Sequence, residues 1–152
     1  EFYKRLKENG IYISNMPEEI YFNKNHDISL IGIWAQEIVH ALHEWNKVVV
    51  SVNHSNSFEQ GLSLRIRQCL GELVKKVLNQ CAINELIIEG GSTTSEVLKH
   101  LEIKKLTPFQ ELETGIIRMK SENNPDLYIT TKPGSYTWPE NVWFHQQLGL
   151  IT

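Results

Sequence analysis

A glycine-rich segment in the second half of the chain has the residue types of a phosphate-binding loop. Residues 89–94 read Glu-Gly-Gly-Ser-Thr-Thr, follow the apolar run at residues 86–88, and precede a segment with helical spacing. Glycine lets the backbone turn sharply and approach a ligand closely. The start of the following helix presents unpaired N–H groups and the positive end of the helix dipole. The sequence therefore predicts an anion cradle at the carboxyl end of a strand; the alternative is a tight turn with a Ser/Thr helix cap.

A second glycine segment lies closer to the carboxyl terminus. Residues 132–135 read Lys-Pro-Gly-Ser and follow a β-rich run at residues 128–131. The segment places a glycine beside hydroxyl and cationic groups, so the two loops could face each other across one phosphate chain. The alternative is a Pro-Gly turn with a solvated lysine. The spacings GxxxxGK[ST] and GxGxxG are both absent, so a nucleotide would be bound by neither of these common motifs.

The elements that must position these loops alternate between β-rich runs and helical periodicity. This alternation predicts an α/β fold, namely a three-layer domain with a mostly parallel or mixed central sheet flanked by helices, formed by residues 1–152 as a single domain. Helices are expected at residues 27–43, 61–80 and 95–101. Strands are expected at residues 11–13, 48–52, 86–88, 103–106, 116–119 and 127–131, with a last short segment at residues 142–148.

Composition and charge narrow the class of protein. The 152 residues include 15 basic and 18 acidic side chains, which argues against a protein that coats nucleic acid. No run reaches the roughly 18 apolar residues of a membrane span, and the start lacks the apolar core of a secretion signal. We therefore expect a cytoplasmic protein with neither membrane nor nucleic-acid partners. Cys69 and Cys81 are too few for a disulfide framework, and Cys69 is expected to be buried.

The order of motifs resembles a known family. Residues 87–94, 113–117 and 132–136 are similar to the nucleotide-binding C-terminal domain of the four-carbon acid sugar kinases, which reads G-G-[DE]-T-[AS], then P-G-V-P, then K-S-G-[NG]-F-G. The resemblance covers about the second half of the chain. It implies ATP and Mg²⁺ as cofactors and transfer of the ATP γ-phosphate to a four-carbon acid sugar. It also implies that a separate N-terminal domain holds the sugar acid, so we expect a C-terminal fragment that is inactive alone.

The resemblance assigns nucleotide-binding roles at the matching positions. Contacts with the ATP phosphates are implied for Gly90, Gly91, Ser92 and Thr93. Gly134 would let the late loop close on the nucleotide, Gly115 would shape the pocket, and Lys132 could offset developing negative charge. No residue is a convincing general base, so the catalytic residues stay unassigned, and no metal-ligating residue is assigned.

The chain also departs from the family pattern. Ser92 replaces an acidic residue, Pro133 stands where Ser is usual, and Thr137 stands where a Gly is expected. Gly115 is followed by Ile-Ile rather than Val-Pro. These departures support an alternative, a non-catalytic relative that acts as a nucleotide-sensing or protein-interaction module. A homodimer also remains open.

Two other groups of residues have types that could carry a function. Glu37, His40 and His43 recur at three-residue spacing, but this differs from the i, i+4 pair of helical zinc sites, so surface histidines are favoured. The aromatic residues near the carboxyl terminus could stack on adenine, line an interface or fill the core, and packing is favoured. They are Tyr136, Trp138, Trp143 and Phe144.

Overall fold

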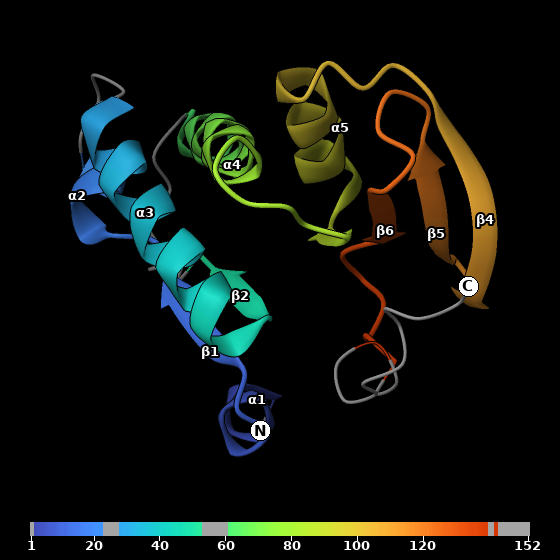
Figure 1. Ribbon diagram of the computed structural model, residues 1–152, viewed down its shortest axis with the longest axis horizontal. Helices are drawn as coiled ribbons and strands as arrows, with labels where there is room; N and C mark the ends of the chain where they lie inside the picture. The colour runs from blue at the N-terminus through green and yellow to red at the C-terminus, as the bar shows by residue number, and fades with distance from the viewer. Residues whose placement is uncertain (1, 23–27, 53–60, 140–141, 143–152) are drawn as a thin grey trace. The chain divides into compact units, whose positions relative to one another are not determined.

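The computed structural model describes residues 2–22, 28–52, 61–139 and 142 of the chain. The chain divides into two compact units, Glu1–Cys81 and Ala82–Thr152 (Figure 1). Asp27, which the sequence offers as a helix cap, and most of the segment expected at residues 142–148 lie outside the described residues. So do the aromatic residues Trp143 and Phe144.

The first unit combines four helices with two parallel strands among its described residues. In chain order they are α1 (Phe2–Glu8), β1 (Tyr12–Asn15), α2 (Glu18–Phe22), α3 (Ile28–Trp45), β2 (Val48–Ser51) and α4 (Leu62–Leu78). Strands β1 and β2 pair in parallel, from Tyr12 opposite Val48 to Asn15 opposite Ser51. Parallel neighbours need a crossover connection, and α2 and α3 fill it.

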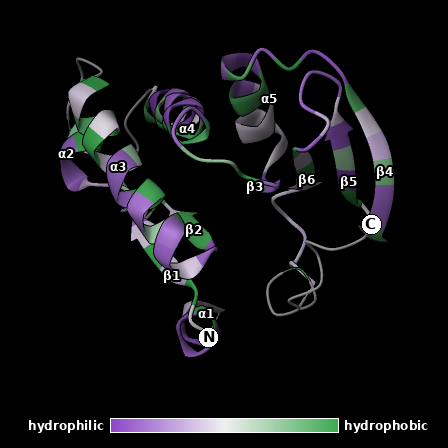
Figure 2. Cartoon of the chain, viewed as in Figure 1, coloured by the Kyte–Doolittle hydropathy of each residue, from purple (hydrophilic) through white to green (hydrophobic). Residues whose placement is uncertain are grey.

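The core of the first unit comes from the apolar stripes of its two long helices. Both kinds of residue, hydrophobic and hydrophilic, are visible along α3 and α4 in Figure 2. Trp34 of α3 is fully buried and its indole N–H donates to the Ser14 hydroxyl at 2.7 Å, which joins the helix to β1. The buried side chains recur at the predicted helical spacing. They include Ile31, Ala35 and Ile38 of α3, and Leu62, Ile66, Cys69, Leu73 and Val77 of α4.

The second unit is a four-stranded mixed sheet with one helix among its described residues. Its elements are β3 (Glu85–Glu89), α5 (Gly91–His100), β4 (Leu106–Glu113), β5 (Ile116–Ser121) and β6 (Tyr128–Lys132). The strand order is β3-β6-β5-β4, in which β3 pairs with β6 in parallel and the other pairs are antiparallel. Figure 1 shows α5 alongside this sheet. Buried apolar residues of these elements include Ile88 of β3, Val97 of α5 and Ile129 of β6.

The structure confirms an α/β fold with parallel and mixed strand pairing and flanking helices. The strands belong to two sheets, one in each unit. Two expected boundaries are wrong. Helix α5 begins at Gly91 rather than at residue 95, and β4 occupies residues 106–113 rather than 103–106. Pro108 lies within β4, an edge strand whose pairing shifts register there, and an edge strand tolerates a residue without an N–H.

Several smaller expectations can be compared with the structure. Cys69 is buried, its burial raises the pKa of the thiol, and both cysteines are free. His40 Nε2 lies 4.0 Å from Glu44 Oε2, and both side chains are exposed on α3. Within the ranges that the structure describes, no three His, Cys, Asp or Glu side chains are grouped to hold a metal ion. None of the described helices has the length and apolar character needed to cross a membrane.

Candidate functional site

The first glycine segment forms a direct passage from strand to helix. β3 ends at Glu89, and Gly90 has φ 89° and ψ 130°, a conformation that favours glycine. Helix α5 starts at the next residue, and no side chain caps it. The Thr94 N–H and hydroxyl both donate to the Gly90 carbonyl at 3.0 Å, which fixes the turn. The N–H groups at the start of a helix have no intrahelical partner, so residues 91–93 present donors at the positive end of the dipole.

The second glycine segment lies at the same edge of the sheet. β3 and β6 are parallel neighbours, so their carboxyl ends are adjacent, and Glu89 stands opposite Lys132. The Gly90 N–H donates to the Lys132 carbonyl at 2.9 Å, which joins the two segments directly. The carboxyl edge of a sheet is where ligands bind in α/β folds. The topology therefore brings together two loops that are far apart in the sequence.

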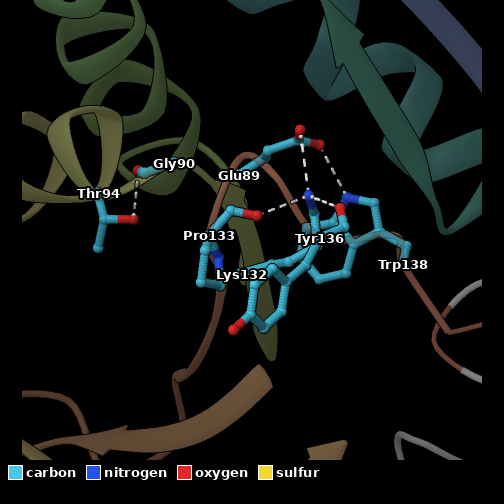
Figure 3. Close-up of polar contacts among 7 residues, drawn as sticks. All are labelled: Glu89, Gly90, Thr94, Lys132, Pro133, Tyr136 and Trp138. Carbon is cyan, nitrogen blue, oxygen red and sulfur yellow. Dashed lines mark hydrogen bonds and ion pairs between the residues drawn. The ribbon is translucent and has the colours of Figure 1, made fainter. Parts of the chain in front are cut away.

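Lys132 is buried, and its ammonium group organises the second loop. The side chain is only 1% exposed. The ammonium donates to the carbonyls of Pro133, at 2.9 Å, and of Tyr136, and its Nζ lies 3.2 Å from Glu89 Oε1 (Figure 3). An ammonium has three N–H donors, and these three acceptors engage them all. The Lys132 ammonium therefore stabilises the conformation of residues 133–136 and does not extend into solvent.

Glu89 and Trp138 complete this arrangement, and sequence reasoning did not select either as a site residue. The Trp138 indole N–H donates to Glu89 Oε2 at 3.0 Å, while Lys132 Nζ lies 5.2 Å from the centre of a Trp138 ring (Figure 3). Both carboxylate oxygens of Glu89 are thus engaged. In the sequence, the opposite charges of Glu89 and Lys132 at the ends of two predicted strands are the signal for this ion pair. That signal can be used only once β3 is known to pair with β6.

Gly115 contacts the late loop, because it lies against the ring of Tyr136. It lies in the turn between β4 and β5 with φ 77°, and its N–H donates to Glu111 Oε1 at 3.2 Å. A Cβ at this position would lie 2.7 Å from Cε2 of the Tyr136 ring. Glycine is thus required here twice, once for the left-handed backbone and once for the packing of the ring. The middle motif and the late loop of the sequence are therefore in contact.

Substitution of Gly115 tests this contact. Gly115→Ala is expected to lower the free energy of unfolding by about 1–2 kcal/mol, because an L-residue is strained at positive φ, and to displace the Tyr136 ring. Gly134→Ala is the matched control, since nothing lies within 4 Å of a Cβ built there. Urea unfolding of both variants measures the difference. Equal stability of the two variants would show that Gly115 is not constrained.

The remaining predicted residues lie around the start of α5 and in the late loop. Gly91 and Ser92 are exposed and Thr93 is half-buried, all in the first turn of the helix. Nothing lies within 4 Å of a Cβ built at Gly91. Gly134 is exposed in the loop after β6. The first turn of α5 therefore carries two hydroxyl side chains beside three backbone donors, residue types that can bind an anion at a helix start.

A comparison with protein families identifies the family to which the chain belongs. A family model described as the nucleotide-binding C-terminal domain matches residues 12–136, which include both glycine segments. The chain belongs to this family. The family model confirms the resemblance of the glycine motifs to a nucleotide-binding C-terminal domain. Three of the similar solved structures carry the name DUF1537. No curated protein matches the chain.

Solved structures support the same fold. A Haemophilus influenzae protein of DUF1537 is 18% identical, with a TM-score of 0.74, and the match covers 97% of this chain and 36% of that one. A DUF1537 protein from Bordetella bronchiseptica, a domain-swapped dimer with bound citrate, is 16% identical with a TM-score of 0.69, and the match covers 89% and 34%. The chain thus spans about a third of the length of these relatives.

Proposed function

We propose that this chain is the ATP-binding domain of a sugar-acid kinase. The longer protein would transfer the γ-phosphate of ATP to a four-carbon acid sugar held by another domain. Membership of the nucleotide-binding C-terminal domain family supports the nucleotide as ligand. Cytoplasmic location and the sugar acid as partner belong to this proposal as well.

The observation that carries the proposal is the uncapped start of α5. A single residue, Gly90, separates β3 from the helix, the first turn has no side-chain cap, and nothing lies within 4 Å of a Cβ built at Gly91. Phosphate oxygens would accept hydrogen bonds from the N–H groups of residues 91–93 and from the hydroxyls of Ser92 and Thr93. The helix dipole favours the negative charge without a basic surface, which agrees with the net charge of −3.

The late loop would cover the bound nucleotide. Lys132 holds residues 133–136 in place through its bonds to two loop carbonyls, and Gly115 supports the loop through Tyr136. In this proposal Lys132 acts on the phosphates through the loop that it fixes, and Gly134 provides a loop position without a side chain. The role proposed for Lys132 is therefore positioning of the loop, whereas the sequence suggested direct charge neutralisation.

Magnesium would be bound chiefly through the nucleotide. Mg²⁺ prefers oxygen ligands in octahedral geometry and usually keeps several waters in kinase sites. Both oxygens of Glu89 already have partners, and Ser92 stands where the family has an acid. The hydroxyls of Ser92 and Thr93 are therefore the side-chain oxygens that fit the ion. When bound, it would neutralise phosphate charge during transfer.

Phosphoryl transfer depends chiefly on positioning and charge stabilisation. The first turn of α5 and the late loop would supply the positioning of ATP. The general base for the sugar hydroxyl would come from the other domain, so this chain alone would bind nucleotide without turnover.

A second candidate is a non-catalytic relative that senses a nucleotide. It is favoured by the three internal partners of the Lys132 ammonium and by Ser92 in place of an acid. Properties of the longer protein distinguish the two candidate functions. An acidic D-D-x-T-G segment upstream, together with nucleotide turnover on sugar acids, would favour the kinase. Binding without turnover in the complete protein would favour the sensor.

The nucleotide proposal predicts stabilisation of the chain by Mg-ATP and Mg-ADP. A ligand that binds only the folded state at ten times its Kd adds about 1.4 kcal/mol, which raises the Tm by roughly 3–6 °C for a chain of this length. Differential scanning fluorimetry at millimolar nucleotide measures the shift, with MgCl₂ and NaCl at the same ionic strength as the control. An unchanged Tm with both nucleotides would refute the proposal.

A further inference from the structure

Tyr136 combines a fixed position with an exposed ring. The residue as a whole is 47% exposed. The main chain at Tyr136 is held by the bond from the Lys132 ammonium to its carbonyl, and the ring packs against Gly115. An aromatic residue whose main chain is fixed, whose ring is packed on one edge and which stays about half exposed is preorganised for contact with a flat ligand, because little ordering remains to be done on binding.

Trp138, the other described aromatic residue of this loop, has a different role. Its indole N–H donates to Glu89 at 3.0 Å, and the Lys132 ammonium lies over its ring at 5.2 Å. Internal contacts therefore occupy both its polar edge and a face of its ring. Of these two aromatic residues, Tyr136 is the one with a ring surface to offer to a ligand.

The loop of Tyr136 is joined to the start of α5. The Gly90 N–H donates to the Lys132 carbonyl at 2.9 Å, and the Lys132 side chain binds the Tyr136 carbonyl. The proposed phosphate donors and the exposed aromatic ring thus belong to one hydrogen-bonded edge of the sheet. A nucleotide carries an anionic end and a flat aromatic end, which match these two features.

We propose that Tyr136 is the base-stacking residue of the nucleotide site. This inference rests on the proposed function and adds the recognition of the base to that of the phosphates. Every nucleobase has a π-face, so stacking tolerates different bases. The site is therefore expected to bind Mg-ATP and Mg-GTP with affinities within about fivefold of each other, since ring stacking distinguishes bases only weakly.

Removal of the ring should weaken nucleotide binding without affecting the phosphate contacts. Loss of a base–aromatic stack is expected to raise the Kd of Mg-ATP about 5- to 150-fold in Tyr136→Leu. Tyr136→Phe keeps the ring and should lose less. Phe109→Leu is the matched control, because Phe109 is 46% exposed on β4 and belongs to neither loop. Isothermal titration of each folded variant with Mg-ATP and with magnesium tripolyphosphate measures both ends of the ligand.

The two ligands separate the outcomes. A selective loss of Mg-ATP affinity in Tyr136→Leu, with tripolyphosphate binding retained, supports the inference. An unchanged Kd for Mg-ATP overturns it and leaves the proposed function intact. An equal loss for both ligands also overturns it, because Tyr136 would then only shape the phosphate site. If the native chain binds neither ligand, the proposed function itself fails.

Discussion

A protein carrying Gly91→Val is expected to fold normally and to lose its stabilisation by Mg-ATP. Gly91 is exposed at the first position of α5, and nothing lies within 4 Å of a Cβ built there. The Cβ of the valine would therefore be accommodated without a clash, and we expect the branched side chain to obstruct the approach of phosphate oxygens to the backbone donors. Because hydrogen bonds to charged groups contribute about 1.5–3 kcal/mol each, blocking two of them should weaken binding a hundredfold or more.

The matched control for this variant is Gly32→Val. Gly32 lies within α3 of the first unit and likewise has nothing within 4 Å of an added Cβ. Both variants add the same side chain to a helix, but only one adds it at the proposed phosphate site. Scanning fluorimetry with and without Mg-ATP should show a full Tm shift for Gly32→Val and none for Gly91→Val. A full shift in both would place the nucleotide elsewhere.

Lys132→Met is expected to have the largest effect on stability. The substitution keeps most of the length of the buried side chain but removes the donor for two loop carbonyls and the partner of Glu89. Glu89 is 53% exposed and can be solvated, so the cost comes mainly from the lost loop bonds. At about 1.5–3 kcal/mol for each hydrogen bond from a charged group, the free energy of unfolding should fall by roughly 3–6 kcal/mol. Binding of Mg-ATP and of tripolyphosphate should weaken together, because the whole loop is loosened.

Lys105→Met provides the comparison for Lys132→Met. The Lys105 ammonium is 3.1 Å from Glu122, but its side chain is 66% exposed, and exposed ion pairs contribute about 0–1 kcal/mol. Urea unfolding should therefore separate the two variants clearly. If Lys132→Met were as stable as Lys105→Met and still bound nucleotide as the native chain does, Lys132 would have no positioning role.

Local patterns predicted much of the fold. The passage from the apolar run at residues 86–88 through Gly90 into a helix follows from residue types alone, because β-branched and apolar residues favour a strand and glycine favours the turn. The sequence predicts the start of α5 four residues late, since Gly91, Ser92 and Thr93 have modest helix propensity. β4 was misplaced because Pro108 reads as a strand breaker, although an edge strand tolerates it.

The internal contacts of the site depend on pairing that local patterns do not carry. Both glycine loops are visible in the sequence, yet the ion pair of Glu89 with Lys132 exists only because β3 and β6 are parallel neighbours. The contact between Gly115 and Tyr136 likewise requires the turn between β4 and β5 to reach the late loop. A lysine beside glycine and serine suggests a solvated charge, whereas the tertiary structure buries it and surrounds it with acceptors.

Titration calorimetry of Mg-ATP into the native chain, Gly91→Val and Gly32→Val tests the central claim most directly. The account predicts saturable one-to-one binding to the native chain and to Gly32→Val, and no measurable binding to Gly91→Val at millimolar nucleotide. It would be contradicted if the native chain released no heat of binding, or if Gly91→Val bound Mg-ATP with the native affinity.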